Sequence, residues 1–262
     1  KRKNHNSALG NRILKLEKEK EDLRLESYAK ARALSDGDDI FFTASDGITK
    51  IPLEIEYYNP AFGGLIAWVR APSINSATDT TIMMYYGNSG APSQQDPTGV
   101  WDANYLAVYH LNQDPSGTVI DSTGHANLGS EGTMGAANLV NAKVGKGIMP
   151  TDYSATIDHL TSTNTITVQS FTMEAWADAD NWYYWMAIAD VNTQASPSNS
   201  REFASNNVAD LGVDTYVNGT QDWRHFADGL NFLHHVVARY NSSTQVVDGF
   251  VDGSPGIHSY NN

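Results

Sequence analysis

Two glutamates stand at a spacing that suits acid–base chemistry on a strand. Glu54 and Glu56 are separated by one residue within the run KIPLEIEYYN. Because alternate residues of a strand face the same side, both carboxylates are expected on one face. Paired carboxylates are what glycoside hydrolysis needs. The plainer interpretation, which we favour, is a solvated strand face.

Two histidines, His234 and His235, are adjacent in the run FLHHVVARYN. Consecutive residues of a strand face opposite ways, so the two imidazoles are not expected to share one metal ion. We therefore predict one buried and one exposed histidine. The sequence also contains no cysteine, no Gly-x-Ser-x-Gly elbow, no glycine-rich phosphate loop and no His-Glu-x-x-His helix. The enzyme classes that depend on those motifs have no support.

Aromatic residues provide candidate platforms for stacking on the apolar face of a sugar ring. Trp182 and Tyr184 share one face of the run WYYW, and core packing is the alternative role for either pair of that run. Trp223 lies in the polar segment QDWR, which we interpret as a loop with an exposed indole. Its neighbours Asp222 and Arg224 would satisfy sugar hydroxyls.

Charge and hydropathy argue against a nucleic-acid partner and against a transmembrane segment. Seventeen Lys and Arg stand against 30 Asp and Glu, which gives a net charge of −13 and a sequence pI near 4.8. Attraction to phosphate backbones is therefore unfavourable, and we predict no nucleic-acid partner. No apolar run approaches the roughly 18 residues needed to span a bilayer, so we predict no transmembrane segment.

The hydrophobic pattern predicts an all-β chain of two β-sandwich domains with one short N-terminal helix. Residues 21–34 are dense in helix formers. Residues 87–99 contain three Gly and two Pro without a large apolar side chain, and we place a boundary near Gln95. The domains are then residues 1–95 and 96–262. Short apolar runs predict strands at 39–44, 50–59, 64–71, 80–88, 105–111, 165–179, 182–191, 232–241 and 245–253.

Two sequons are candidate glycosylation sites. Asn218-Gly219-Thr220 and Asn241-Ser242-Ser243 both fit the Asn-x-Ser/Thr pattern. Such patterns also arise by chance in a chain rich in Asn and Ser. Modification requires a host that glycosylates secreted proteins.

Two resemblances together cover nearly the whole chain. The first half, through DLRLESYAKARALSDGDDIFFTASDGITKIPLEIEYYNP, LIAWVRAPSI and TTIMMYYGN, resembles the microbial surface-protein family named domain of unknown function 2341. The second half is similar to the laminin-G-like, concanavalin A-type jelly roll. The motifs that carry this second similarity are VWDANYLAVYHLNQDPSGTVIDSTGHANLG, AKVGKGI, FTMEAWADAD and HHVVARYNSSTQVVDGFVDG.

The resemblances imply a secreted or cell-surface β-sandwich protein in which glycan binding and adhesion are usual and catalysis is generally absent. They place Asp121, in the segment DSTG, near an edge where related modules carry calcium; no cofactor is required, and calcium is the one candidate. They also place Trp176 inward. Glycanases of this fold carry a third acid where Tyr57 and Tyr58 follow the glutamates, which favours the solvated face.

The resemblances also indicate departures at both ends. The first strand is shortened, and the chain stops before the usual closing strands of the jelly roll, so it is expected to be incomplete at its C-terminus. Unpaired sheet edges invite self-association. The function expected is a noncatalytic extracellular module for carbohydrate binding or adhesion, with a glycan or a surface protein as partner. The alternative is a structural subunit of an extracellular filament or surface layer, and a glycan hydrolase is the weaker alternative.

Overall fold

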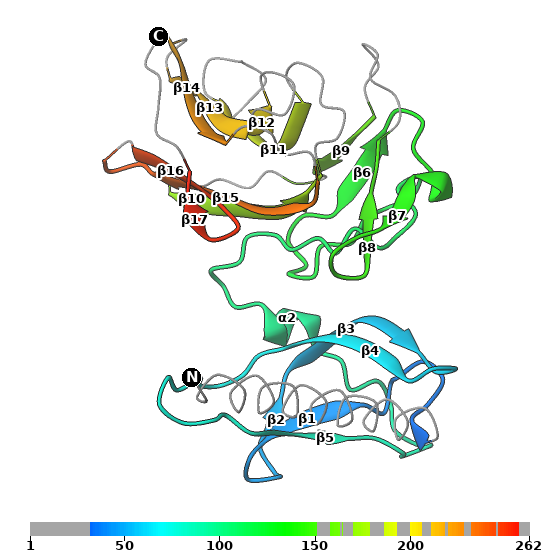
Figure 1. The fold of residues 1–262 in the computed structure, drawn as a ribbon. Coiled ribbons are helices and arrows are strands. Elements are labelled where there is room, and N and C mark those ends of the chain that lie inside the picture. The colour runs from blue at the N-terminus through cyan, green and yellow to red at the C-terminus, as the bar shows by residue number, and fades with distance from the viewer. Residues whose placement is uncertain are drawn as a thin grey trace, which may run out of the picture. The chain divides into compact units, whose positions relative to one another are not determined.

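The computed structural model describes residues 32–150, 158–162, 164, 170–178, 186–192, 200–205, 211–217, 220–227, 232–244 and 246–256. Its contacts divide the chain into two compact units at Thr151, except that Asp158–Asn164 belongs to the first unit. The predicted all-β class is confirmed (Figure 1). The described helices are α2 (Pro97–Val100) and the 3-10 turn η1 (Ala136–Asn138). The predicted helix at 21–34 lies outside the described residues except for its last three positions.

The first unit begins with five strands at positions that the sequence predicts. A three-stranded antiparallel sheet has the order β2-β1-β5, and β3 pairs with β4 as a hairpin. The turn between β1 and β2 is fixed by Asp46, whose Oδ1 accepts from the N–H groups of Ile48 and Thr49 at 2.9 Å. The bounds are β1 (Phe41–Ala44), β2 (Lys50–Ile51), β3 (Leu53–Asn59), β4 (Gly64–Val69) and β5 (Ile82–Tyr85).

Strand β3 contains an irregularity that matters for the site. Ile55 pairs with Ala67 and Tyr57 pairs with Ile66, so the register shifts between Ile55 and Tyr57 and leaves Glu56 as the extra residue. Such a bulge bends the strand and redirects a side chain. Glu56 therefore does not follow the simple alternation that the sequence suggests.

The rest of the first unit consists of short two-stranded ribbons joined by loops. These are β6 (Leu128–Glu131) with β9 (His159–Ser162), and β7 (Leu139–Asn141) with β8 (Lys146–Ile148). The strand predicted at 105–111 is wrong, because the structure shows irregular backbone there. Side-chain carboxylates, described below, take the place of a strand partner in holding this segment.

The segment 87–99 is fastened to the first unit. The backbone N–H of Gln94 donates to the carbonyl of Asp38 at 2.9 Å, and that of Asp96 donates to Leu53 at 2.8 Å. The side-chain Oε1 of Gln95 accepts from the N–H of Ile55 at 2.8 Å. The domain boundary near Gln95 stays a prediction.

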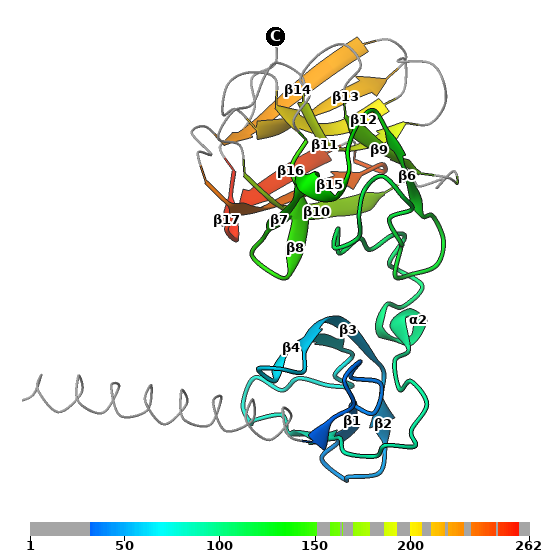
Figure 2. The same ribbon diagram turned by 90° about the vertical axis from the view of Figure 1, so that its right-hand side faces the viewer.

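The second unit contains two four-stranded antiparallel sheets, which Figures 1 and 2 show as two layers. Strands β14 and β16 contact one another across the layers. This arrangement is consistent with a β-sandwich. One sheet is β10 (Phe171–Ala177), β15 (His234–Asn241), β16 (Val246–Val251) and β17 (Ser254–Pro255). The other is β11 (Met186–Asn192), β12 (Ser200–Ser205), β13 (Leu211–Val217) and β14 (Thr220–Ala227).

Alternation along β15 gives this sheet an inner and an outer face. His234, Val236 and Ala238 are buried, whereas the side chain of His235 is partly exposed, which confirms the prediction for the two histidines. Trp176 pairs with His235 and is 44% exposed, so the inward placement expected from the jelly-roll resemblance is wrong. The cause is register, since Trp176 shares the face of His235 and not that of His234.

Asp252 and Gly253 adopt φ of 50° and 76° and form the tight turn between β16 and β17. The loop predicted at 221–224 is wrong, because these residues pair with β13 as part of strand β14. A polar sequence can still form a strand when its backbone has a partner. Within the described residues, no helix has the length and apolar character needed to cross a membrane.

Candidate functional site

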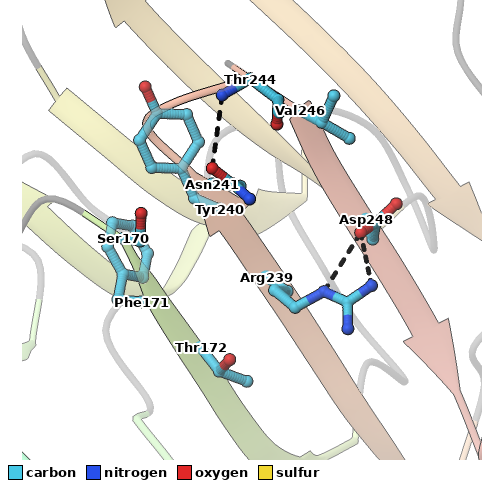
Figure 3. A pocket seen from close by; sticks show the side chains of 9 residues that line it. All are labelled: Ser170, Phe171, Thr172, Arg239, Tyr240, Asn241, Thr244, Val246 and Asp248. Carbon is cyan, nitrogen blue, oxygen red and sulfur yellow. Dashed lines mark hydrogen bonds and ion pairs between the residues drawn. The ribbon is translucent and has the colours of Figure 1, made fainter.

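An open cleft of about 470 Å³ lies on the sheet β10-β15-β16, at the end that carries the β15–β16 turn (Figure 3). The strands bring together Thr172, Arg239 and Asp248, which are cross-strand neighbours in one row. The lining combines hydroxyl, amide, charged and aromatic groups. It consists of Ser170, Phe171, Thr172, Arg239, Tyr240, Asn241, Thr244, Val246 and Asp248.

A charged pair forms the polar part of this cleft. The guanidinium of Arg239 donates from Nε at 3.1 Å and from Nη2 at 2.6 Å to the same Oδ2 of Asp248. The guanidinium carbon also lies 5.6 Å from the ring centroid of Phe250 on the neighbouring strand. A planar fork that is held by a carboxylate and an aromatic ring is preorganised for further hydrogen bonds.

Phe171 and Tyr240 form the neighbouring cross-strand pair, with ring centroids 5.7 Å apart and tilted by 43°. Because alternate residues of a strand face opposite sides, these rings lie on the other face of the sheet from Arg239 and Asp248. At the end of the cleft, the hydroxyl of Ser170 contacts the turn, because its Oγ accepts from the backbone N–H of Ser242 at 3.0 Å. The cleft is therefore mainly polar, and the charged pair is its most ordered part.

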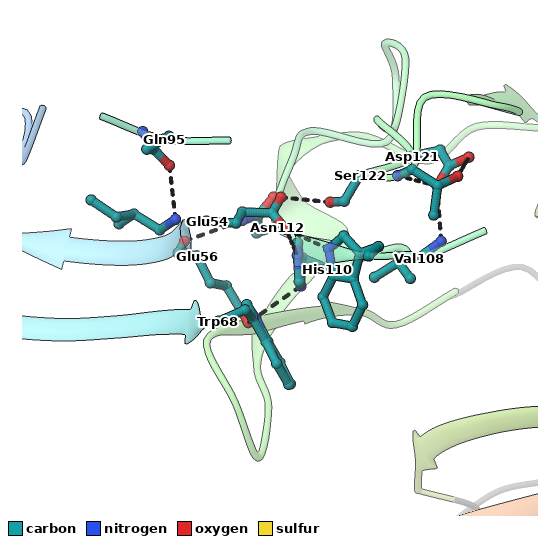
Figure 4. Close-up of polar contacts among 12 residues, drawn as sticks. Glu54, Glu56, Trp68, Gln95, Val108, His110, Asn112, Asp121 and Ser122 are labelled. Carbon is teal, nitrogen blue, oxygen red and sulfur yellow. Dashed lines mark hydrogen bonds and ion pairs between the residues drawn. The ribbon is translucent and has the colours of Figure 1, made fainter. Parts of the chain in front are cut away.

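The first unit holds a second cluster, which is buried (Figure 4). Nε2 of His110 lies 3.1 Å from Oε2 of Glu54, and Nδ1 lies 3.3 Å from Oε2 of Glu56. The side chains of His110, Glu54 and Glu56 are only 8%, 11% and 2% exposed. The favoured interpretation of the two glutamates as a solvated strand face is therefore wrong. Their shared partner, His110, comes from a loop more than fifty residues further along the sequence.

Three further donors occupy the same carboxylates. The indole Nε1 of Trp101 donates to Oε2 of Glu54 at 2.8 Å, and the hydroxyl of Ser122 donates to Oε1 at 2.6 Å. The indole Nε1 of Trp68 donates to Oε2 of Glu56 at 2.6 Å. Helix α2 places Trp101 directly after its last residue, Val100.

The electrostatic balance at Glu54 favours the carboxylate. Burial raises the pKa of Glu54, but the contacts with His110, Ser122 and Trp101 outweigh it, and the pKa lies below the usual 4.5. His110 brings one ring nitrogen to each carboxylate, so a single imidazole faces both Glu54 and Glu56.

Aromatic rings enclose this cluster. The ring of His110 stacks on Trp68 with centroids 5.6 Å apart and an interplanar angle of 24°. Trp101 lies 5.5 Å from Trp68 and packs edge-on against Tyr105 at 5.0 Å. The rings limit access of water and strengthen the polar contacts between them.

The backbone beside His110 is unusual. Leu111 has a φ of 53°, in the left-handed region that bulky residues rarely adopt. Asn112 follows and donates from Nδ2 to the backbone carbonyl of Glu56 at 3.2 Å. These contacts hold the segment in a conformation that its local sequence does not favour.

Asp121, the predicted calcium ligand, is buried and accepts five hydrogen bonds. Oδ1 accepts from the N–H groups of Val108 and Thr123, and Oδ2 accepts from the Thr123 hydroxyl and from the N–H groups of His125 and Ala126, all at 2.6–3.0 Å. Burial raises the pKa of Asp121, but these hydrogen bonds lower it below the usual 3.8. No group of three or more His, Cys, Asp or Glu in the described part of the chain has a geometry suited to a metal ion. Calcium binding stays a prediction.

The other predicted site residues stay untested. Trp182, Tyr184 and Asn218 lie outside the described residues. Asp222, Trp223 and Arg224 lie on β14, opposite residues 213–215 of β13. Asn241 is exposed at the end of β15, and its Oδ1 accepts from the N–H groups of Ser243 and Thr244.

Sequence reasoning missed His110, Trp68 and Trp101 in the buried cluster and Arg239 and Asp248 in the cleft. No spacing rule links the first three to the glutamates. Arg239 and Asp248 could have been predicted to face one another, because the hairpin of β15 and β16 places them opposite one another.

Comparison with known proteins gives one match. Residues 36–125 match the family described as "Domain of unknown function (DUF2341)". This confirms the resemblance stated for the first half, which includes Glu54 and Glu56. The match also extends through residues 100–125, with His110 and Asp121, which the sequence analysis assigned to the jelly roll. No curated protein and no solved structure matches the chain. The similarity of the second half to a laminin-G-like jelly roll stays a prediction.

Proposed function

We propose that this chain is a noncatalytic module of the extracellular space or cell surface that binds carbohydrate through the cleft on β10, β15 and β16. The observation that carries the proposal is the preorganised pair of Arg239 and Asp248 in an open cleft that also presents hydroxyl and amide groups. A pyranose presents hydroxyls at its rim, and these can donate to a carboxylate and accept from a guanidinium.

The buried cluster supports the noncatalytic part of the proposal. A glycoside hydrolase needs one carboxyl group that reaches the leaving oxygen and a second that reaches water or the anomeric carbon. Glu54 and Glu56 instead accept from Trp101, Ser122 and Trp68 inside the fold. Buried carboxylates whose oxygens already accept hydrogen bonds from the protein stabilise the fold by linking distant segments of the chain.

The resemblance to laminin-G-like jelly rolls supports the saccharide part. In this view the two sheets of the second unit are a jelly roll, and the residues predicted from the sequence, Trp182, Tyr184, Asp222, Trp223 and Arg224, would form a further contact region. The extracellular location follows from the same resemblance and is part of the proposal.

Glycan-array screening of the full chain, with and without calcium, followed by calorimetry, tests the function. Arg239→Gln is expected to weaken saccharide binding at least tenfold, which is the effect of losing one to two hydrogen bonds to a charged group. Arg70→Gln, which removes an exposed Arg–Asp pair in the first unit, is the matched control and should bind like the wild type. Failure to bind any glycan, or equal binding by both variants, would overturn the proposal.

A second candidate, a subunit of an extracellular filament or surface layer, is favoured by strand β5. Within the described residues β5 pairs with β1 alone and forms the edge of its sheet. Ile82, Met83 and Tyr85 on this edge are exposed. An apolar edge strand is a template for pairing with another copy.

Light scattering and electron microscopy test this second candidate. The wild type should form ordered assemblies at high concentration, and Met83→Lys should prevent them because a charged side chain blocks edge pairing. Met149→Lys changes an equally exposed methionine off this edge and should assemble like the wild type. A wild type that remains monomeric at every concentration contradicts the candidate.

A further inference from the structure

We propose that the cleft selects neutral saccharides, through a pair of adjacent hydroxyls, over glycans that carry carboxylate or sulfate groups. This inference rests on the proposed carbohydrate-binding function and specifies its ligand class. It depends on which donor and acceptor atoms of Arg239 and Asp248 stay available after the two side chains bind one another.

The pair leaves one acceptor and one set of donors for a ligand. Both bonds between the side chains converge on Oδ2 of Asp248. Among the described residues, none donates to Oδ1 of Asp248 and none accepts from Nη1 of Arg239. Figure 3 shows the guanidinium reaching across from β15 to the carboxylate of Asp248 on β16, so these groups lie side by side in the cleft.

A pair of hydroxyls matches these two groups. One hydroxyl can donate to Oδ1 of Asp248 while its neighbour accepts from Nη1 of Arg239, because each hydroxyl is both donor and acceptor. A carboxylate or sulfate only accepts. It would use the guanidinium but would meet the carboxylate of Asp248 with like charge.

The charges around the cleft disfavour anions further. The positive charge of Arg239 is paired with Asp248, so the lining has no surplus cation. Glu174 is exposed on the same outer face, two register positions from the pair of Thr172 and Arg239. The chain as a whole carries a net charge of −13. An anionic glycan would approach against this field.

Calorimetry of the full chain with two sets of oligosaccharides tests the inference. One set is neutral gluco-, galacto- and mannooligosaccharides, and the other is their uronic-acid and sulfated counterparts. We expect binding of a neutral oligosaccharide that changes less than twofold between low and high salt. A deoxy analogue that lacks one of the two hydroxyls should bind about tenfold more weakly.

Asp248→Ser gives the sharpest contrast. It removes the acceptor and frees the Arg239 charge, so it should lose neutral binding and gain affinity for sulfated oligosaccharides. Glu174→Ser removes the same charge on the same face outside the cleft and should keep the neutral preference. Thermal melting followed by circular dichroism confirms that both variants fold.

The outcomes separate the two proposals. Tighter binding of the anionic set by the wild type overturns the ligand class but leaves carbohydrate binding intact. An equal gain of anion binding in Asp248→Ser and Glu174→Ser also overturns it, because general charge would then explain the effect. Absence of binding to either set overturns the proposed function itself.

Discussion

The indole of Trp101 donates a hydrogen bond of 2.8 Å to Glu54, a residue 47 positions earlier in the chain. This contact joins the segment after helix α2 to strand β3. Ser122 also donates to Glu54, and His110 contacts both Glu54 and Glu56. These contacts surround the two buried carboxylates with polar partners and stabilise the first unit.

Replacing Glu54 by Gln should destabilise the first unit by about 2 kcal/mol, because the amide nitrogen cannot accept a hydrogen bond and leaves a buried donor, Trp101 or Ser122, without its partner. Chemical denaturation of the purified chain measures this change. Asp102→Asn is the control, since its pair with Arg70 at 3.7 Å is exposed and should contribute less than about 1 kcal/mol. Equal effects of the two substitutions would contradict the role assigned to Glu54.

His110 and Glu54 should be energetically coupled. His110→Phe keeps a ring that stacks on Trp68 but removes both nitrogens, so its cost reports on the contacts with the carboxylates. In a double-mutant cycle with Glu54→Gln, the two effects should fall short of additivity by about 1 kcal/mol or more. Strict additivity would show that the two side chains act independently.

Acid should destabilise the first unit through Glu54 and Asp121. Both groups have a pKa in the folded protein below the usual values of 4.5 and 3.8. Their contribution is therefore fully present above the unfolded-state pKa and is lost as the pH falls through the folded-state pKa. The free energy of unfolding, measured by denaturation at a series of pH values, should decline below roughly pH 4.5. Glu54→Gln should show a shallower decline, and an unchanged slope would count against this origin.

Gly145→Ala should be costly although it adds a single methyl group. Gly145 has a φ of 55°, and a Cβ there would meet Oε1 of Glu56. We expect a loss of more than about 1 kcal/mol, from backbone strain and displacement of the carboxylate. Gly135→Ala is the matched control, because Gly135 has an extended φ of −155° and a Cβ there meets nothing within 4 Å. Thermal melts of the two variants distinguish the sites, and similar melting temperatures would refute the close approach.

Asp121→Ala should lower the melting temperature with or without a chelator, because five hydrogen bonds are lost in either case. Calcium ligation predicts an additional effect, a fall in the wild-type melting temperature when EDTA is added. Scanning calorimetry of wild type and variant, with and without EDTA, separates the two roles. A variant as stable as the wild type would contradict the hydrogen-bond role.

Local sequence pattern predicts much of this fold. Runs of alternating apolar residues predict β1 to β5, β15 and β16 correctly, and strand alternation predicts the different burial of His234 and His235. The pattern fails where distant residues decide the outcome. Residues 105–111 have the composition of a strand but no strand partner, and Glu56 is redirected by a bulge that no single strand reveals.

The same limit applies to the candidate sites. Glu54 and Glu56 were found from their spacing, but their burial depends on Trp68, Trp101, His110 and Ser122, which share no motif with them. Arg239 and Asp248 face one another because a hairpin sets their register. Register follows from the turn, so this pair is the part of the sites that sequence reasoning could have reached.

The contact between Ser122 and Glu54, 68 residues apart, also has a consequence for synthesis on the ribosome. When β3 leaves the exit tunnel, its two acidic side chains have no cover until much more of the polypeptide has emerged. During this time the nascent strand β3 is exposed to solvent, and its two carboxylates disfavour its aggregation with other apolar segments. The same two charges therefore protect the incomplete chain from aggregation and later stabilise the folded unit.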